Sequence, residues 1–277
     1  MGNDTRPVTQ TNIIMKHIIK ISFSVLAGVM LFSSCKKNEI KYGEFDLVGA
    51  NQALFKVNFL SQYKSAPSVV FIIDGKRVNN PITARTPFPG GGLNTGGGST
   101  ANYMVFNSGS HEFKVVVPSK LTNLDSMELY KTNISLEAGK YQTLHITDTA
   151  ENTYSTLVVD DLTRPDSGKV RYRFINLMPN SPELNLYYDS TLMAEKIAYK
   201  GSAEFFKPAG LTAATRGWWV RDASLGSAAP ALVSYTTASG VNSSQLNQRV
   251  FTVFTSGFAG LPSSDGRRSF LSFVFNL

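Results

Sequence analysis

The stretch FKVNFLSQYKSAPSVVFIIDGK (residues 55–76) aligns without a gap with VRYRFINLMPNSPELNLYYDST (residues 170–191). Identical residues occupy matching positions, namely Phe59 and Phe174, Pro67 and Pro182, and Asp74 and Asp189. Apolar residues alternate before each Asp, at Val69, Phe71 and Ile73 and at Leu184, Leu186 and Tyr188. Alternating positions share one face of a β-strand. The match predicts a duplicated unit in which each strand ends in a turn at the Asp.

Short alternating runs bounded by turn residues occur along most of the chain. They include HEFKVVV (111–117), YQTLHIT (141–147), LNLYYD (184–189) and RSFLSFVF (268–275). Such runs are typical of antiparallel strands. Only LTNLDSMELYK (121–131) is a weak candidate for a helix. We therefore expect an all-β protein with two tandem immunoglobulin-like antiparallel β-sandwich domains.

The polar segment DDLTRPDSGK (160–169) separates the two copies and is typical of a linker or a surface turn. We predict a first, more divergent sandwich over residues 50–162 and a second over residues 169–277. The first copy also carries the insertion PFPGGGLNTGGGST (87–100). A phosphate-binding loop would need a Lys after its last Gly, and none is present. The insertion is predicted to be a mobile surface loop or lid.

The N-terminal region predicts a lipid anchor. MKHIIKISFSVLAGVMLFSSC (15–35) has a basic start, a short apolar run and small residues before Cys35, the only cysteine of the chain. The apolar run is shorter than the roughly 20 residues that cross a bilayer. The stretch LFSSC resembles a bacterial lipoprotein signal, in which the cysteine thiol receives diacylglycerol. The alternative is a short membrane or core segment with an incidental cysteine.

On the lipoprotein interpretation, residues 1–34 are a signal region whose true start is Met15, and residues 35–49 are a lipidated tether. The protein would then lie in the cell envelope, anchored to the outer membrane on its periplasmic or its surface side. The mature chain would contain no cysteine besides Cys35, and therefore no internal disulfide.

Charge and motifs exclude several classes of function. Lys and Arg exceed Asp and Glu by 27 to 20, but the basic residues are scattered, which argues against nucleic acid as a partner. His111 and His145 lie in predicted strands without a nucleophile or metal-ligand motif beside them. Carboxylates such as Asp160 fall at turns and strand ends, where they usually bind their own backbone. We expect no catalytic residue, no metal and no cofactor.

Aromatic residues are the candidates for ligand binding. Trp218 and Trp219 are adjacent, as are Tyr187 and Tyr188, and adjacent strand residues point to opposite faces. One member of each pair should lie in a core, and the other could stack on a sugar ring. The alternative is that the outer aromatic packs against the neighbouring domain.

The segment KVRYRFINLMPNSPELNLYYDSTLM (169–193) resembles the DUF4397 family, a domain of unknown function found in bacterial secreted and lipid-anchored proteins. The second copy carries the residues of the pattern, namely Arg173, Phe174, Asn176, Pro179, Pro182, Leu186, Tyr188 and Asp189. The first copy has Phe59, Ala66, Pro67, Phe71, Asp74 and Gly75, but Lys64 replaces the earlier proline. The resemblance implies tandem β-sandwiches in a Bacteroidetes-type envelope lipoprotein, and it implies no activity.

Three short motifs resemble the acceptor sequence of Bacteroidetes periplasmic O-glycosylation, with candidate acceptors at Ser126, Thr149 and Ser190. Together, these patterns predict a non-enzymatic cell-envelope lipoprotein with a binding, adhesion or structural role and a glycan or an envelope protein as partner. The alternative is an accessory carbohydrate-binding lipoprotein of a nutrient-uptake system.

Overall fold

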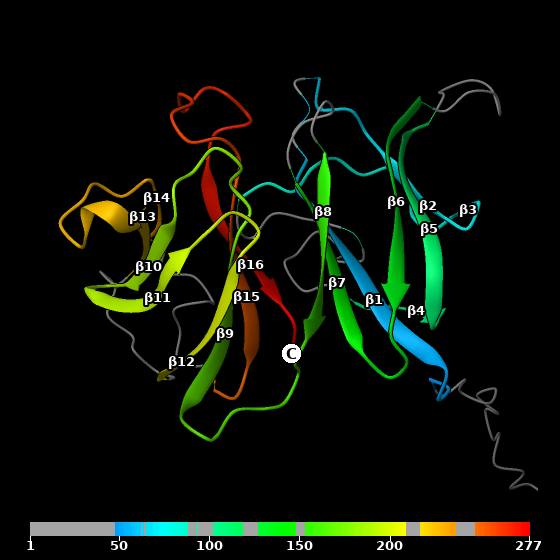
Figure 1. Ribbon diagram of the computed structural model, residues 1–277, viewed down its shortest axis with the longest axis horizontal. Helices are drawn as coiled ribbons and strands as arrows, with labels where there is room; N and C mark the ends of the chain where they lie inside the picture. The colour runs from blue at the N-terminus through cyan, green and yellow to red at the C-terminus, as the bar shows by residue number, and fades with distance from the viewer. Residues whose placement is uncertain are drawn as a thin grey trace, which may run out of the picture. The chain divides into compact units, whose positions relative to one another are not determined.

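The computed structural model describes residues 48–61, 63, 65–87, 93, 102–118, 127–147, 153–208, 217–236 and 247–277 (Figure 1). The predicted signal region, the tether with Cys35, most of the glycine-rich insertion, Ser126 and Thr149 lie outside these residues. Residues Val48–Leu277 form one compact unit. Within the described part of the chain, no helix is long and apolar enough to cross a membrane.

The first half of this unit consists of two four-stranded sheets, with strand orders β4-β1-β7-β8 and β3-β2-β5-β6. The strands are β1 (Gln52–Phe59), β2 (Val70–Ile73), β3 (Lys76–Arg77), β4 (Met104–Asn107), β5 (Gly109–Val117), β6 (Met127–Leu136), β7 (Tyr141–Thr147) and β8 (Tyr154–Asp160). The weak helix candidate is wrong over residues 127–131, because these residues begin β6 and pair with β5.

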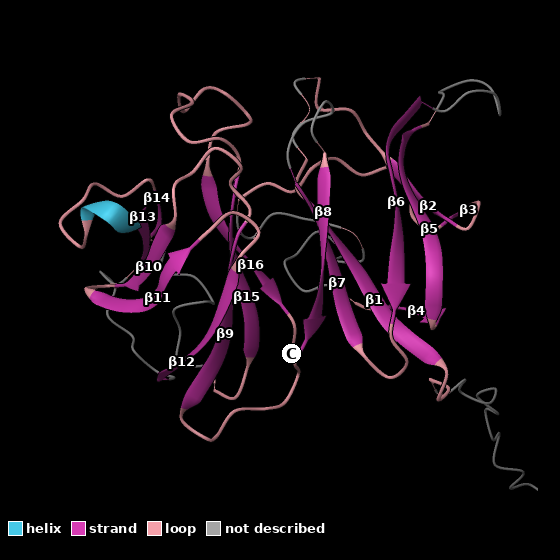
Figure 2. Cartoon of the chain, viewed as in Figure 1, coloured by secondary structure: helices cyan, strands magenta, loops and turns pink. Residues whose placement is uncertain are grey.

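The second half repeats this arrangement, with strand orders β12-β9-β15-β16 and β11-β10-β13-β14 (Figure 2). Its strands are β9 (Lys169–Asn176), β10 (Leu184–Tyr188), β11 (Thr191–Ile197), β12 (Ser202–Pro208), β13 (Trp218–Asp222), β14 (Val233–Tyr235), β15 (Val250–Ser256) and β16 (Phe270–Phe275). The one helical element of the described residues is a short 3-10 turn, η1 (Ala223–Leu225). Each strand of the first half therefore has a counterpart at the same place in the second.

The predicted all-β fold of two sandwiches is confirmed, and the structure adds two details. β1 runs parallel to β7, and β9 runs parallel to β15, so each sandwich contains one parallel pair among antiparallel ones. The first two strands of each half lie in different sheets, whereas they share a sheet in the immunoglobulin order. A pattern of alternating residues predicts a strand but does not specify the direction of its neighbour.

Two separate cores fill the sandwiches. The first contains Val69, Phe71 and Ile73, and the second contains Leu184, Leu186 and Tyr188 (each at most 3% exposed). The alternating residues of the aligned stretches therefore point into the two cores. They do so from β2, with Val69 directly before it, and from β10. At the following turns, Asp74 and Asp189 adopt positive φ angles of 48° and 58°, which Asp tolerates better than most residues.

Candidate functional site

The two sandwiches are joined by a third apolar cluster, which lies on the outward faces of the sheets that contain β1 and β9. Its buried members are Leu60, Ile175, Leu177, Phe254, Phe270 and Val274, with Val158 packed against them. Hydrogen bonds cross the same boundary. The Thr147 hydroxyl donates to the carbonyl of Leu177 at 2.8 Å. We call this contact between the two halves the junction.

Three cationic side chains cross the junction. Lys56 Nζ donates to Asn276 Oδ1 at 2.7 Å, and Arg85 Nη2 donates to the carbonyl of Phe273 at 2.8 Å. In the opposite direction, Arg173 Nη1 donates to the carbonyl of Val159 at 2.8 Å. Lys56 and Arg85 are 2% and 4% exposed. Burial lowers the pKa of Lys56 to about 8 and that of Arg85 to about 10, so both remain largely protonated at neutral pH.

Asp160 is the buried carboxylate of the junction among the described residues. It accepts hydrogen bonds from Tyr103 at 2.8 Å and from Thr143, and Arg173 Nη1 lies 3.5 Å from its other oxygen. Beside it, Asn58 Nδ2 donates to Nδ1 of His145 at 3.0 Å. Burial, together with the charges of Lys56, Arg173 and Arg85, lowers the pKa of His145 to about 3. The imidazole is therefore neutral at physiological pH.

Several buried polar atoms of the junction have no hydrogen-bond partner. They are Asn58 Oδ1, Arg85 Nε, His145 Nε2, Asp160 Oδ1, Ser256 Oγ and Ser272 Oγ. In folded proteins nearly all buried polar groups are paired, so a group of unpaired ones calls for a specific explanation. The set contains one cationic group, at Arg85 Nε, and one anionic group, at Asp160 Oδ1, which lies 3.5 Å from Arg173 Nη1. The junction therefore combines an apolar cluster with buried polar and charged groups.

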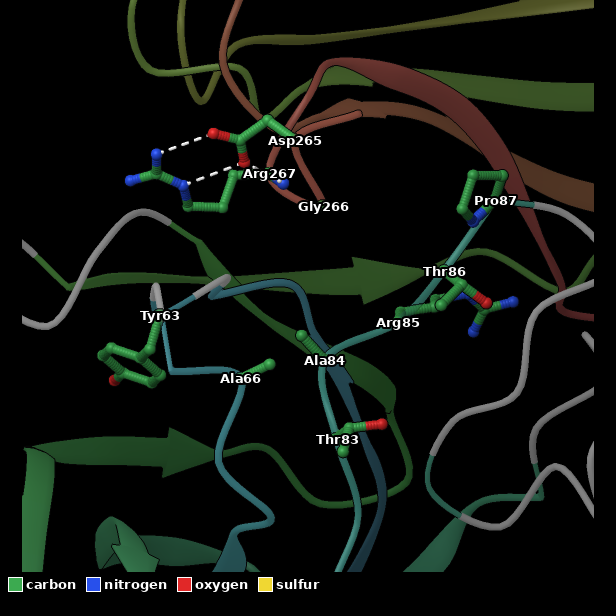
Figure 3. Close-up of a pocket in the computed structure, with 10 residues that line it drawn as sticks. All are labelled: Tyr63, Ala66, Thr83, Ala84, Arg85, Thr86, Pro87, Asp265, Gly266 and Arg267. Atoms are coloured by element: carbon green, nitrogen blue, oxygen red, sulfur yellow. Dashed lines mark hydrogen bonds and ion pairs between the residues drawn. The ribbon is translucent and has the colours of Figure 1, made fainter. Parts of the chain in front are cut away.

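A cavity of about 380 Å³ opens beside the junction (Figure 3). Residues 63, 66 and 83–87 of the first half and residues 265–267 of the second line it. Its volume falls in the range of small-molecule sites, roughly 300–1,000 Å³. We call it the junction pocket. Pro87, the first residue of the glycine-rich insertion, is one of its lining residues.

The charged groups of the junction pocket are one ion pair and one arginine that forms no ion pair in the described part of the chain. Asp265 and Arg267 form a two-point ion pair, with Arg267 Nη2 at 2.8 Å and Nε at 3.1 Å from the carboxylate oxygens. In Figure 3 this pair lies across the pocket from Ala84 and Thr83. Arg85 makes no ion pair within the described residues, and its guanidinium lies 5.7 Å from the Phe254 ring. The lining therefore carries one charge that no carboxylate balances.

Two of the aromatic residues predicted to bind ligand are not available to one. Trp218 and Tyr188 are 0% and 3% exposed, and their rings pack against each other at 4.8 Å inside the second core. The prediction for these two residues is wrong because both point inward from β13 and β10. The expectation that adjacent aromatics face opposite sides of the sheet is correct.

Trp219 and Tyr187 lie on the outward face, directly opposite each other across β13 and β10. The row continues to Leu192 on β11 and to Ser234 on β14. Trp219 is half-buried, whereas Tyr187 is 6% exposed. A Cβ built on Gly217 would come within 3.0 Å of the Trp219 ring, so the indole lies over this glycine. Of the four aromatics, only Trp219 retains a substantially accessible ring.

The remaining candidates occupy separate places. His111 bonds to Asp74 at 2.6 Å and to the carbonyl of Asn107 at 2.8 Å, so it supports a turn. Ser190 is exposed in the turn between β10 and β11. The described residues contain no group of three or more His, Cys, Asp or Glu side chains that could hold a metal ion.

Comparison with protein families shows that residues 55–187 match the model of DUF4397, described as a domain of unknown function. The match runs from β1 through the whole first half and ends within β10. The resemblance in the sequence was strongest over the second half, so the match gives more weight to the first copy than expected. No curated protein matches the chain.

Three solved structures resemble the chain at low scores. A streptococcal virulence factor that binds α-glucan is 14% identical, with 82% of this chain and 97% of that one covered and a TM-score of 0.24. A candidate cell-adhesion protein from Bacteroides uniformis ATCC 8492 is 8% identical, with coverages of 81% and 97% and a TM-score of 0.23. A candidate adhesin from Bacteroides ovatus is 11% identical, with coverages of 73% and 88% and a TM-score of 0.19. TM-scores this low carry no argument about ligand or mechanism.

Proposed function

We propose that this chain is a non-enzymatic, lipid-anchored protein of the cell envelope that binds a ligand between tandem DUF4397-like sandwiches. The observation that carries this proposal is the junction pocket, whose walls come from both halves. A cavity shared by two units is a common place for a ligand site. The described histidines support a binding role rather than catalysis, because His145 is buried and neutral and His111 is held in a turn.

Ligand binding can be tested with a panel of neutral and acidic monosaccharides and short peptides, read by saturation-transfer NMR. Thr83 is exposed at the pocket, so Thr83→Trp should fill the cavity without entering either core. Asn133→Trp, at an exposed position on β6 that does not line the pocket, is the control. At least one compound should bind the wild type and the control but not Thr83→Trp. If no compound distinguishes these variants, the pocket is not the binding site.

The anchor rests on the sequence of residues 15–35 and is tested on protein made in its native type of host. Intact-mass spectrometry should show a mature chain that begins at Cys35 and carries a diacylglyceryl group. Cys35→Ala should shift the protein from the membrane fraction to the soluble fraction. A wild-type chain with an unmodified Cys35 would contradict the anchor. The same spectra would show any hexose added at Ser126, Thr149 or Ser190.

A second candidate function, carbohydrate binding at the outer face of the second sandwich, is favoured by Trp219. Its indole lies over Gly217 and beside Tyr187, which gives a flat aromatic surface, and Arg221 lies 5.8 Å from the Tyr187 ring. Flat aromatic surfaces can stack on sugar rings. On a glycan array, Trp219→Ala should then lose binding that Thr83→Trp retains. Equal binding by Trp219→Ala and the wild type would exclude this surface.

A further inference from the structure

We propose that the junction pocket selects an acidic ligand and that Arg85 binds its carboxylate. This inference rests on the proposed function, because it names the class of ligand for the same pocket. It goes further because it assigns Arg85 as the side chain that binds the ligand, and because it predicts that the charge of the ligand matters more for affinity than its shape.

The first argument is the charge of Arg85. Its side chain is 4% exposed, and a buried cation is normally paired with a carboxylate. Here Nη2 donates to the Phe273 carbonyl, Nε has no partner, and no ion pair is formed within the described residues. The ring of Phe254 compensates the charge only in part. A ligand carboxylate in the pocket would supply the missing negative charge.

The second argument is that nothing else at this place neutralises Arg85. Asp265 is the carboxylate of the lining, and its two oxygens are occupied by Arg267 at 2.8 Å and 3.1 Å. Lys56, which belongs to the same half, carries a like charge that acts on Arg85, although Asp160 offsets part of the Lys56 charge. Both charges also act on His145. The electrostatic field at this end of the pocket therefore favours an anion.

The third argument is the character of the remaining walls. Tyr63, Ala66, Ala84 and Pro87 present mainly carbon atoms, and Thr83 and Thr86 add hydroxyl groups. A guanidinium beside such walls suits a small organic acid, whose carboxylate takes the Arg and whose body lies on the apolar surface. A sugar acid and an aromatic acid share this chemistry, so the experiment includes both.

The test compares matched acidic and neutral probes by calorimetry. Benzoate and benzamide have nearly the same shape and differ in charge, and glucuronate and glucose form the corresponding sugar pair. We expect one acid to bind at least tenfold more tightly than its neutral partner, because a hydrogen bond to a charged group is stronger than a neutral one. A preference for glucuronate assigns a sugar acid, and a preference for benzoate assigns an apolar acid.

Variants locate the effect. Arg85→Met should abolish the preference for the acid, Arg85→Lys should retain part of it, and Arg77→Met, at an exposed site in the β2–β3 hairpin, should leave it unchanged. Circular dichroism establishes that each variant is folded. If Arg85→Met does not fold, Thr83→Trp decides, since it should block the acid while leaving Arg85 in place.

The possible failures are distinguishable. If acids and neutral partners bind the pocket equally, the inference about Arg85 is overturned and the proposed binding function stands. If an acid is preferred but Thr83→Trp still binds it, the site lies elsewhere and the inference is also overturned. If no probe binds, the inference is overturned, and the wider ligand panel decides the proposed function.

Discussion

Asn176 should be among the most costly polar residues to remove from this protein. It is 0% exposed at the end of β9, and its amide bonds four groups. Its Oδ1 accepts from Met178 N at 3.1 Å and from Thr255 Oγ1 at 3.0 Å. Its Nδ2 donates to Ser181 Oγ at 3.0 Å and to the carbonyl of Ile197 at 3.1 Å. One side chain thus connects segments that are far apart in the sequence.

The size of the effect follows from the groups left without a partner in Asn176→Ala. Thr255 and Ser181 each keep a second hydrogen bond in this variant. The Thr255 hydroxyl accepts from Leu177 N, and the Ser181 hydroxyl donates to the Met178 carbonyl. The backbone groups of Met178 and Ile197 cannot reorient in this way. Each orphaned buried group costs about 1–3 kcal/mol, so the loss should be about 4 kcal/mol. The control is Asn180→Ala, whose two bonds to Ala259 are exposed and whose removal should cost less than about 1 kcal/mol.

Urea unfolding followed by tryptophan fluorescence measures this difference. Both tryptophans of the chain, Trp218 and Trp219, lie in the second sandwich, so the signal reports on the half that contains Asn176. A stability loss in Asn176→Ala no greater than that in Asn180→Ala would refute the argument that the amide is a structural hub.

Three further predictions follow from residues already described. Trp218→Ala should lose about 3–5 kcal/mol of stability and Trp219→Ala much less, since only the former empties a core site; urea midpoints measure both. Gly257→Ala should be far more destabilising than Gly75→Ala in thermal melts: both glycines have positive φ, but a Cβ on Gly257 would lie 2.2 Å from the Arg268 carbonyl oxygen, whereas one on Gly75 meets nothing within 4 Å. Burial lowers the pKa of His111, but its hydrogen bonds to Asp74 and to the Asn107 carbonyl have the larger combined effect and raise the His111 pKa above 6.5. The same bond between the two side chains lowers the pKa of Asp74 below 3.8. The pair should therefore stabilise the fold fully between pH 3.8 and 6.5, and this stabilisation should decrease as pH falls through the pKa of Asp74 or rises through that of His111. Melting temperatures of Asp74→Asn, measured across and beyond this pH range, should lack both changes. A variant whose melting temperature depends on pH in the same way as that of the wild type would contradict this.

Local sequence patterns predicted most of the strands. YQTLHIT coincides with β7, and the alternation before Asp74 and Asp189 correctly identified inward-facing residues. These signals are local, because a strand with one buried face alternates wherever its partners lie. The parallel pairing of β1 with β7 was not predictable in this way, since it joins Phe59 to Ile146.

The candidate site was largely missed for the same reason. The junction pocket combines residues 63–87 with residues 265–267, and no pattern in either segment points to the other. Lys56 and His145 occupy outward positions of ordinary alternating strands, which normally face water, and they became buried only because a second sandwich covers that face. The adjacent aromatics gave the correct faces, but their exposure depended on neighbours in other strands.

The position of β1 and β9 inside their sheets sets the order in which the molecule can fold. β1 pairs with β4 on one side and with β7 on the other, and Lys56 meets its β7 partner Thr143 only after the intervening chain has been made. In the same way, β9 can form its parallel pair only after β15 has been made. Folding is slow in such a topology, because the entropy cost of closing long loops comes before the stabilising contacts have formed. Each sandwich must therefore stay open until its seventh strand has been made, and until then the first strand of each copy can mispair with its counterpart in the other.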